Sequence, residues 1–442
     1  MPYRNTSSKD AAHQLNVEFV VQNRLCIGCG VCEMVCPNQA IKMIFDVSYS
    51  MPSPHVNNKK CNQCHKCLDV CYGYGVDNAL YTKLFGHLPL SITGIHKKCY
   101  IGHASDPVLK YRSTSGGVVT ALLVHALEQG MIDGAIVTRM EAGNPPQAKA
   151  FIATTADEIY SCVGSKYCPV SFAECLKSVD RCKKYAVVGL PCHIYGLRKL
   201  AEHRTQVGTS LSLFFGLLCG GMPNWAGTLY LLKSYGMENH YISRLEYRGG
   251  GWPGRLLVQK NGSRKNGQAI QIPYPAYWRQ TYQFFFPYRC TVCNDGFNEL
   301  SDLSFGDAWL PHLVGREKGG WSVVIARTDT GEGLVEEASA KNRIRIDPLD
   351  IREVTTSQRG LLRFKFSELT ARIKLYRALR FHLPMVDSNR ALPTRPGHYL
   401  SAIQLHVGRT IASKRRLWKI LGPYVSASSL LKTAEDFLRI LD

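Results

Sequence analysis

The segment CIGCGVCEMVCP, residues 26–37, decides the N-terminal fold, and the segment CNQCHKCLDVC, residues 61–71, repeats its C-x2-C-x2-C-x3-C spacing. In a protein that holds two cubane clusters, three thiolates of such a run bind one 4Fe–4S cluster and the fourth reaches across to the other. The spacing therefore predicts two crossed ligand sets. The first set is Cys26, Cys29, Cys32 and Cys71, and the second is Cys61, Cys64, Cys67 and Cys36.

A pair of zinc knuckles is the alternative interpretation of these cysteines. Zinc sites usually pair two short C-x2-C units over a longer gap, whereas Pro37 follows the first run as it does in bacterial ferredoxins. Gly28 and Gly30 allow the backbone to approach the inorganic sulfides closely. One departure is Tyr72, which stands where a proline would follow the second run. We predict a two-cluster 4Fe–4S ferredoxin-like domain over residues 15–80.

Composition places the chain in a reducing compartment. The 442 residues include 17 cysteines, and the N-terminus has no apolar run of signal-peptide length, so we expect a cytoplasmic protein. There, clustered cysteines indicate metal or redox chemistry more often than disulfides. The longest apolar stretch, residues 211–232, is broken by Gly220, Gly221 and Pro223, which predicts a strand, a turn and a helix instead of a membrane span.

From about residue 105 the pattern alternates between helix and strand. Helical spacing is found at 115–130 and 170–185, and buried strands are predicted at 134–140, 185–192 and 211–219. Residues 242–274 form three short strands in this prediction, with Asn261-Gly262 as a hairpin turn. We predict an α+β protein, in which a mixed α/β catalytic domain follows the ferredoxin-like domain and precedes a helical C-terminal extension.

The extension, residues 366–442, is basic. From Leu361 to the end there are fifteen Lys/Arg and five Asp/Glu, within a formal charge of +20 for the whole chain. A solvated helical face is the simplest interpretation, and contact with an acidic partner or a peripheral membrane surface is the sharper one. No recognition motif accompanies the charge, so no nucleic-acid partner is predicted. We expect the extension to be dispensable for cofactor content.

Three short segments leave alternatives open. The loop RSTSGGVVT, residues 112–120, suits the diphosphate of a dinucleotide, but an ordinary helix N-cap is the favoured interpretation. The loop GSKYCP, residues 164–169, carries Lys166, for which a surface position is the default. The pair Cys290 and Cys293 suits disulfide exchange, half a zinc site or half an iron–sulfur site.

Taken together, several segments resemble the coenzyme F420 hydrogenase/dehydrogenase beta subunit family, preceded by a two-cluster ferredoxin domain. In chain order they are SGGVVTALLVHALEQG, GSKY, VVGLPCHIYGLRK, LFFGLLCGG, YRGGGWPG, CTVCNDGFNELSDLSFGDAW and GWSVVIART. The resemblance implies that residues 95–185 and 186–365 are the N- and C-terminal parts of one catalytic domain. It also implies FAD and a third 4Fe–4S cluster. The implied ligands of that cluster are Cys192, Cys219, Cys290 and Cys293.

The resemblance also assigns the flavin site. The implied FAD phosphate contacts are Ser115, Gly116, Gly117 and Thr120, and the implied ring contacts are Ser165, Lys166 and Tyr167. Lys166 is the candidate catalytic residue, because a cation beside the ring stabilises reduced anionic flavin. Asp307 is a further candidate contact, with capping of the following turn as its alternative.

The function implied by the resemblance is an oxidoreductase. It exchanges hydride between FAD and an organic substrate, either coenzyme F420 or another two-electron carrier, and passes single electrons through 4Fe–4S clusters. The alternative is an electron-transfer subunit that has no organic substrate of its own. The expected partners are a redox protein or a ferredoxin pool, within an oligomer or a larger complex.

Overall fold

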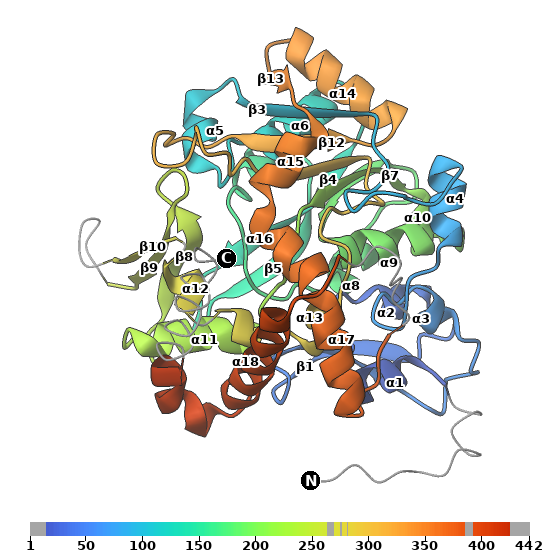
Figure 1. Cartoon of the computed structure of the whole chain (residues 1–442). Helices are drawn as coiled ribbons and strands as arrows, with labels where there is room; N and C mark the ends of the chain where they lie inside the picture. Colours follow the sequence, from blue (N-terminus) through green and yellow to red (C-terminus); the bar gives the residue numbers. More distant parts are fainter. Residues whose placement is uncertain (1–14, 263–268, 275, 281, 385–391, 425–442) are drawn as a thin grey trace.

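The N-terminal cysteine runs form a ferredoxin-like domain, as predicted. The computed structural model describes residues 15–262, 269–274, 276–280, 282–384 and 392–424 (Figure 1). The domain comprises α1 (Val17–Gln22), α2 (Val31–Val35), β1 (Ile41–Asp46), β2 (Met51–Val56), α3 (Lys66–Asp69) and α4 (Ala79–Phe85). Strands β1 and β2 pair antiparallel, and each cysteine run is a loop that leads into a short helix, α2 or α3.

The second part of the chain is built on an eight-stranded mixed sheet with the order β13-β3-β12-β11-β7-β6-β4-β5. The strands are β3 (Lys98–Ala104), β4 (Gly134–Glu141), β5 (Gln147–Ala153), β6 (Tyr185–Gly189), β7 (Leu211–Leu217), β11 (Leu303–Asp307), β12 (Ser322–Ala326) and β13 (Ile344–Pro348). Strands β4, β6, β7 and β11 are parallel neighbours. Strand β12 runs antiparallel to both β11 and β3, so β3 points in the same direction as the four. The carboxyl ends of five strands therefore share one edge.

Other elements cover both faces of the sheet. Alternate residues of its strands point to opposite faces, so each face contributes to a different core. Ala135, Ala186 and Phe215 pack in one core with α6 (Val118–Glu128) and α14 (Asp329–Ala340). Ile136 and Phe214 pack in the other core with α9 (Pro191–Glu202) and the ferredoxin-like domain. This burial on both faces explains the almost continuous apolar runs of β6 and β7.

The predicted β insertion forms a separate sheet of β8 (Ile242–Gly249), β9 (Arg255–Lys260) and β10 (Ile270–Pro273), in the order β10-β9-β8. The Asn261-Gly262 turn follows β9 as expected, with Gly262 at φ +79°, and residues 263–268 lie outside the described part. The apolar stretch 211–232 forms β7, a turn and most of α11 (Trp225–Ser234). Among the described residues, no helix has the length and apolar character to cross a membrane.

One predicted helix is much shorter than its sequence pattern. Residues 170–185 show helical spacing, but only α8 (Ala173–Lys177) is helical. The N–H of Phe172 donates to the carbonyl of Cys29 (2.9 Å), and the N–H of Lys184 donates to the Asp133 carboxylate (2.7 Å). These tertiary hydrogen bonds replace the helical ones at both ends of the segment. The remaining short helices are α5 (Pro107–Arg112), α7 (Ala156–Tyr160), α10 (Gln206–Thr209), α12 (Ala276–Gln280), η2 (Tyr282–Phe285) and α13 (Tyr288–Thr291).

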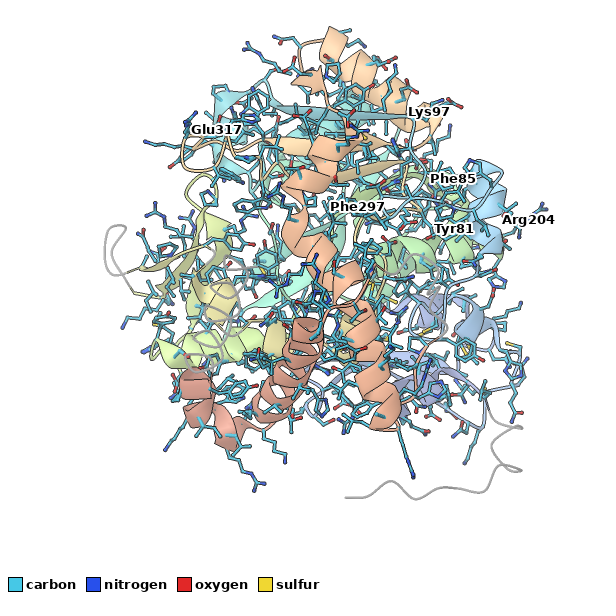
Figure 2. The ribbon with its side chains drawn as sticks, viewed as in Figure 1. Tyr81, Phe85, Lys97, Arg204, Phe297 and Glu317 are labelled. Atoms are coloured by element: carbon cyan, nitrogen blue, oxygen red, sulfur yellow. The ribbon has the colours of Figure 1, made fainter. Side chains whose placement is uncertain are left out.

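The C-terminal region is helical, as predicted, but it is not a separable extension. It comprises α15 (Ile351–Ser357), α16 (Arg359–Leu362), the π-helical η3 (Arg363–Ser367), α17 (Leu369–Ala378), α18 (Pro396–Ala412) and η4 (Arg415–Leu417). In Figure 1, α15, α16 and α17 follow one another across the molecule from the sheet toward the ferredoxin-like domain. The buried Phe297 ring, labelled in Figure 2, lies 6.5 Å from the ring of Phe366.

This helical region also closes over the loop that carries the C-x2-C pair. The Arg372 side chain on α17 is 1% exposed and donates to the carbonyl of Thr291 (2.6 Å), between Cys290 and Cys293. It also bonds the carbonyl of Phe364 and pairs with Glu368 (3.3 Å). The extension therefore packs on a predicted ligand loop. Its dispensability for cofactor content stays a prediction.

Arg372→Met should destabilise the folded protein by about 3 kcal/mol, because it leaves the carbonyls of Thr291 and Phe364 without this donor and leaves the Glu368 carboxylate with Arg363 as its remaining ion-pair partner. Thermal unfolding of the iron-loaded protein measures the loss, and iron should dissociate at a lower temperature. Arg377→Met, an exposed position of the same helix, is the matched control and should change nothing. Equal unfolding midpoints for the two variants would show that the contact with Thr291 does not stabilise the fold.

Candidate redox site

The common strand direction gathers most of the predicted site residues at one sheet edge. Cys192 lies in the first turn of α9, directly after β6, and Cys219 lies two residues beyond β7. Asp307 is the last residue of β11, and the loop 113–117 meets the end of β3, where the N–H of Ala104 donates to the carbonyl of Gly116 (2.7 Å). Ligands of open α/β sheets bind outside the carboxyl ends of their strands, so this edge is the candidate site.

The four cysteines implied for a third cluster lie close together. Burial raises the pKa of the Cys192 thiol well above its usual range, and the neighbouring Cys219, Cys290 and Cys293 raise it further. Burial likewise raises the pKa of Cys219 to about 12. Packing several buried thiols together makes each harder to ionise, and bound iron would relieve that cost by supplying positive charge.

Cys293 is the exception among the four. Burial acts to raise the pKa of its thiol, but the cations Lys365 and Arg289 and a hydrogen bond from Tyr72 lower the pKa below its usual value. The Tyr72 hydroxyl lies 3.2 Å from the Cys293 sulfur. Burial acts to lower the pKa of Lys365, yet the thiolates of Cys293, Cys219 and Cys290 raise it to about 12. Sequence reasoning assigned no role to Lys365 or Arg289.

The ferredoxin-like domain brings Cys71 to the first cysteine run. Burial raises the pKa of Cys26 to about 12, and the charge of Cys71 contributes to the shift. Burial raises the pKa of Cys67 to about 11, with Cys71, Cys61 and Cys64 nearby. The N–H of Gly28 donates to the sulfur of Cys26 (3.4 Å), and the N–H of Ala40 donates to that of Cys36 (3.3 Å).

The described residues contain no group of three His, Cys, Asp or Glu side chains placed to hold a single metal ion. The ligands of a 4Fe–4S cluster do not have to surround one common metal position, because each of the four thiolates binds a different iron.

The loop 113–117 does not form the ordinary N-cap favoured by its sequence. Helix α6 has Gly117 as its N-cap, at φ +81°, and no side chain of the described residues caps it. Instead, the Thr114 hydroxyl accepts from the N–H of Ser165 (2.8 Å), and the Ser115 hydroxyl lies 3.3 Å from that of Ser322. The buried Ser113 hydroxyl has no hydrogen-bond partner in the described structure. Thr120 lies in the first turn of α6.

Glycine is required at position 116 by the backbone itself. Gly116 has φ +81°, and a Cβ there would lie 2.8 Å from the carbonyl oxygen of Gly320. The residue is therefore needed for the close approach of two loops, whatever the loop binds.

The Lys166 side chain binds backbone carbonyls of its own loop and is not a free surface side chain. Its ammonium donates to the carbonyls of Gly164 (2.8 Å) and Val163 (3.3 Å) and also bonds the carbonyl of Cys162. Burial lowers its pKa from the usual 10.5 to about 8. The adjacent Tyr167 ring packs 4.6 Å from that of Trp278.

Asp307 neither caps a turn nor stands free, because its carboxylate is bound by Arg248. The two guanidinium nitrogens lie 2.6 and 3.1 Å from the carboxylate oxygens, and the indole N–H of Trp252 donates to the same carboxylate (2.9 Å). Arg248 also contacts the carbonyl of Thr114 (3.4 Å) and lies 4.4 Å from the Tyr274 ring centre. Arg248 and Trp252 lie in the YRGGGWPG segment, which contributes to the family resemblance, but sequence reasoning assigned no role to either residue.

The fold and the grouped cysteines define an iron–sulfur redox protein with a ferredoxin-like domain. A 4Fe–4S dicluster domain profile matches residues 25–73. The profiles of the coenzyme F420 hydrogenase/dehydrogenase beta subunit match residues 99–177 (N-terminal part) and 182–352 (C terminus), together more than half of the chain. The chain therefore belongs to the coenzyme F420 hydrogenase/dehydrogenase beta subunit family, a family of iron–sulfur oxidoreductases.

Known relatives include the coenzyme F420-dependent sulfite reductase of Methanocaldococcus jannaschii, 27% identical over 355 residues. The match covers 76% of this chain but only half of that relative's length. The coenzyme F420 hydrogenase subunit beta of Methanothermobacter thermautotrophicus is 25% identical over 59% of this chain and 87% of its own. A chain of the F420-reducing [NiFe] hydrogenase complex from Methanosarcina barkeri has the same fold, with a TM-score of 0.52 and 20% identity over 68% of this chain and 99% of that one.

The depressed pKa of Lys166 predicts a pH-dependent stability. Between pH 8 and 10.5 the unfolded chain binds more protons at this residue than the folded chain, so folded stability rises with pH across that window. The unfolding midpoint of wild type relative to Lys166→Met should rise over the same interval. Lys183→Met, at an exposed position, should give a flat difference. A flat difference for Lys166→Met as well would show that Lys166 has an ordinary pKa.

Proposed function

We propose that the chain is a flavin-dependent iron–sulfur oxidoreductase that exchanges hydride between FAD and a two-electron carrier and passes single electrons through three 4Fe–4S clusters. Coenzyme F420 is the proposed carrier, because the names of the relatives above include it. The observation that carries the proposal is the single sheet edge, where the uncapped start of α6, the Arg248–Asp307 pair and the four core cysteines meet.

The residues at this edge fit a dinucleotide. The first-turn N–H groups of α6 have no side-chain cap within the described structure and the Ser113 hydroxyl has no partner there, so an anionic diphosphate would satisfy both. We assign the phosphates to Ser115, Gly116, Gly117 and Thr120, and the ring to the loop of Ser165, Lys166 and Tyr167. When bound, FAD would supply the exchange between hydride and single-electron chemistry.

The chain's own residues prepare this site in two ways. The N–H of Ser165 donates to the Thr114 hydroxyl, so the phosphate loop and the ring loop are held in register (2.8 Å). Arg248 binds both Asp307 and the carbonyl of Thr114, and its buried guanidinium places positive charge beside the loop. Asp307 is thus a positioning residue for Arg248 in this proposal, rather than a direct flavin contact.

The proposed electron route leads from this edge into the ferredoxin-like domain. Cys192, Cys219, Cys290 and Cys293 would hold the core cluster, with Lys365 and Arg289 as buried counter-charges. Cys29 of the first N-terminal set lies near Cys192. This contact supports an order in which the core cluster would lie between the flavin and the two N-terminal clusters.

The flavin assignment is tested by Arg248→Met against Arg244→Met on the same strand. Arg244 pairs with Glu246 at an exposed position, so its loss should have little effect. Arg248→Met leaves Asp307 without its buried partner and should release most of the bound FAD, which is quantified by absorbance after denaturation. Wild type without releasable FAD would contradict the flavin site. It would then favour the alternative function, an electron-transfer subunit with no organic substrate.

The core cluster is tested by Cys290→Ser against Cys182→Ser, an exposed cysteine with no assigned ligand role. Reconstituted wild type should contain about twelve irons per chain, and Cys290→Ser about eight, because one set of four cysteine ligands loses a member. Cys182→Ser should match wild type. Flavin in Cys290→Ser should still be reduced by F420H2, while electron transfer to an external one-electron acceptor slows. Eight irons in fully reconstituted wild type would contradict the third cluster.

A further inference from the structure

Tyr72 joins the ferredoxin-like domain to the core cysteines. It follows Cys71, the fourth cysteine of the second run, at the position where a proline was expected. Its side chain is 3% exposed, and its hydroxyl lies 3.2 Å from the sulfur of Cys293, 221 residues away in the chain. One residue thus follows a proposed ligand of the first N-terminal cluster and contacts a proposed ligand of the core cluster.

The direction of this hydrogen bond follows from the chemistry of the ligand. A cysteine bound to iron is a thiolate and has no proton to donate, so the Tyr72 hydroxyl is the donor. A hydrogen bond to a cluster sulfur stabilises negative charge there, and the reduced cluster carries one more negative charge than the oxidised one. The bond therefore favours the reduced form and raises the reduction potential.

Arg289 completes the junction from the side of the core. It precedes Cys290, is 1% exposed, and donates through Nε to the carbonyl of Tyr72 (3.1 Å). Its guanidinium lies 4.3 Å from the centre of the Tyr72 ring. Among the described residues no carboxylate forms an ion pair with Arg289. Its Nη1 contacts the carbonyl of Val292 (3.4 Å), and its buried Nη2 has no acceptor there. An unneutralised buried cation with a free N–H between two thiolate sets fits an anionic cluster as its missing partner.

The two domains approach closely around this junction. A Cβ at Gly196 on α9 would lie 3.2 Å from both the Val31 side chain and the carbonyl of Val70. Tyr72 and Tyr195 pack edge to face with ring centres 5.5 Å apart, and both belong to the core shared by the two domains. The two domains are thus tightly packed beside the Tyr72–Cys293 contact.

We propose that Tyr72 and Arg289 are positioning residues of the electron-transfer junction between the core cluster and the cluster of Cys26, Cys29, Cys32 and Cys71. The Tyr72 hydroxyl raises the reduction potential of the core cluster through Cys293, and Arg289 orients Tyr72. With both clusters bound, the junction would allow one electron to pass between them in either direction, with no bond formed or broken. This inference rests on the core cluster of the proposed function.

The test is a redox titration of the iron-loaded Tyr72→Phe variant, followed by electron paramagnetic resonance. Phenylalanine keeps the ring and removes only the hydroxyl. The core cluster should become harder to reduce. At equilibrium, the ratio of reduced core cluster to reduced N-terminal clusters should fall about tenfold, which corresponds to a reduction potential lower by ~59 mV for one electron. The N-terminal potentials should stay unchanged. Electron transfer into the N-terminal clusters after flash reduction of the flavin should change in rate.

Two further variants keep the result interpretable. Tyr195→Phe removes a neighbouring hydroxyl that bonds to the backbone of Asp77 and Asp69, so it should leave all potentials unchanged. Arg289→Lys keeps the charge but loses the planar fork, and should reproduce part of the Tyr72→Phe shift. A third cluster with the same potential and rate in Tyr72→Phe as in wild type would overturn this inference alone. If the wild-type protein holds no third cluster, both this inference and the proposed function with three clusters are overturned.

Discussion

The common direction of β3, β4, β6, β7 and β11 is the constraint on which the rest of the structure depends. Parallel strands place their carboxyl ends at one edge, so residues far apart in the chain meet without any local motif bringing them together. Cys192, Cys219 and Asp307 follow or end three neighbouring strands, and the start of α6 meets the end of a fourth. Reversing any of these strands would send its terminal residue to the opposite edge.

Buried cations are the second feature of the molecule, and three of the arginines have fixed polar partners. Arg248 binds Asp307, and Arg372 binds Glu368 and two backbone carbonyls. Arg327 is held by the Ser304 hydroxyl and by the carbonyls of residues 93, 95 and 297. Desolvating such charges is costly unless the partners are fixed. Arg248 therefore binds loops at the carboxyl edge of the sheet, whereas Arg327 binds those at the amino end of β11. Arg289 and Lys365 lie near thiols in place of carboxylates.

The C-terminal helices give the core cysteines their enclosure. Lys365 lies in the π-helical segment that precedes α17, and Arg372 reaches the backbone between Cys290 and Cys293. A wider helical turn rotates the side chains around it relative to an α-helix, and such segments are frequent at functional sites. The basic residues of this region therefore differ in role: Lys365 and Arg372 are buried beside the C-x2-C loop, whereas Lys374, Arg377 and Lys414 are among the described cations that are exposed.

The sequence by itself determined the ferredoxin-like domain, the buried strands and the β insertion, because each depends on local spacing. A C-x2-C-x2-C-x3-C run specifies its loop and short helix within twelve residues, and an apolar run such as that of β7 specifies a doubly buried strand. The family resemblance supplied the four core cysteines, which the structure brings together. Only the tertiary structure decided the role of side chains whose partners are distant. The Arg248–Asp307 pair, the Tyr72–Cys293 contact and the packing of Arg372 on Thr291 each join residues 59 or more positions apart. No periodicity in a single sequence records such pairs, because they arise where strand ends and helices converge in space.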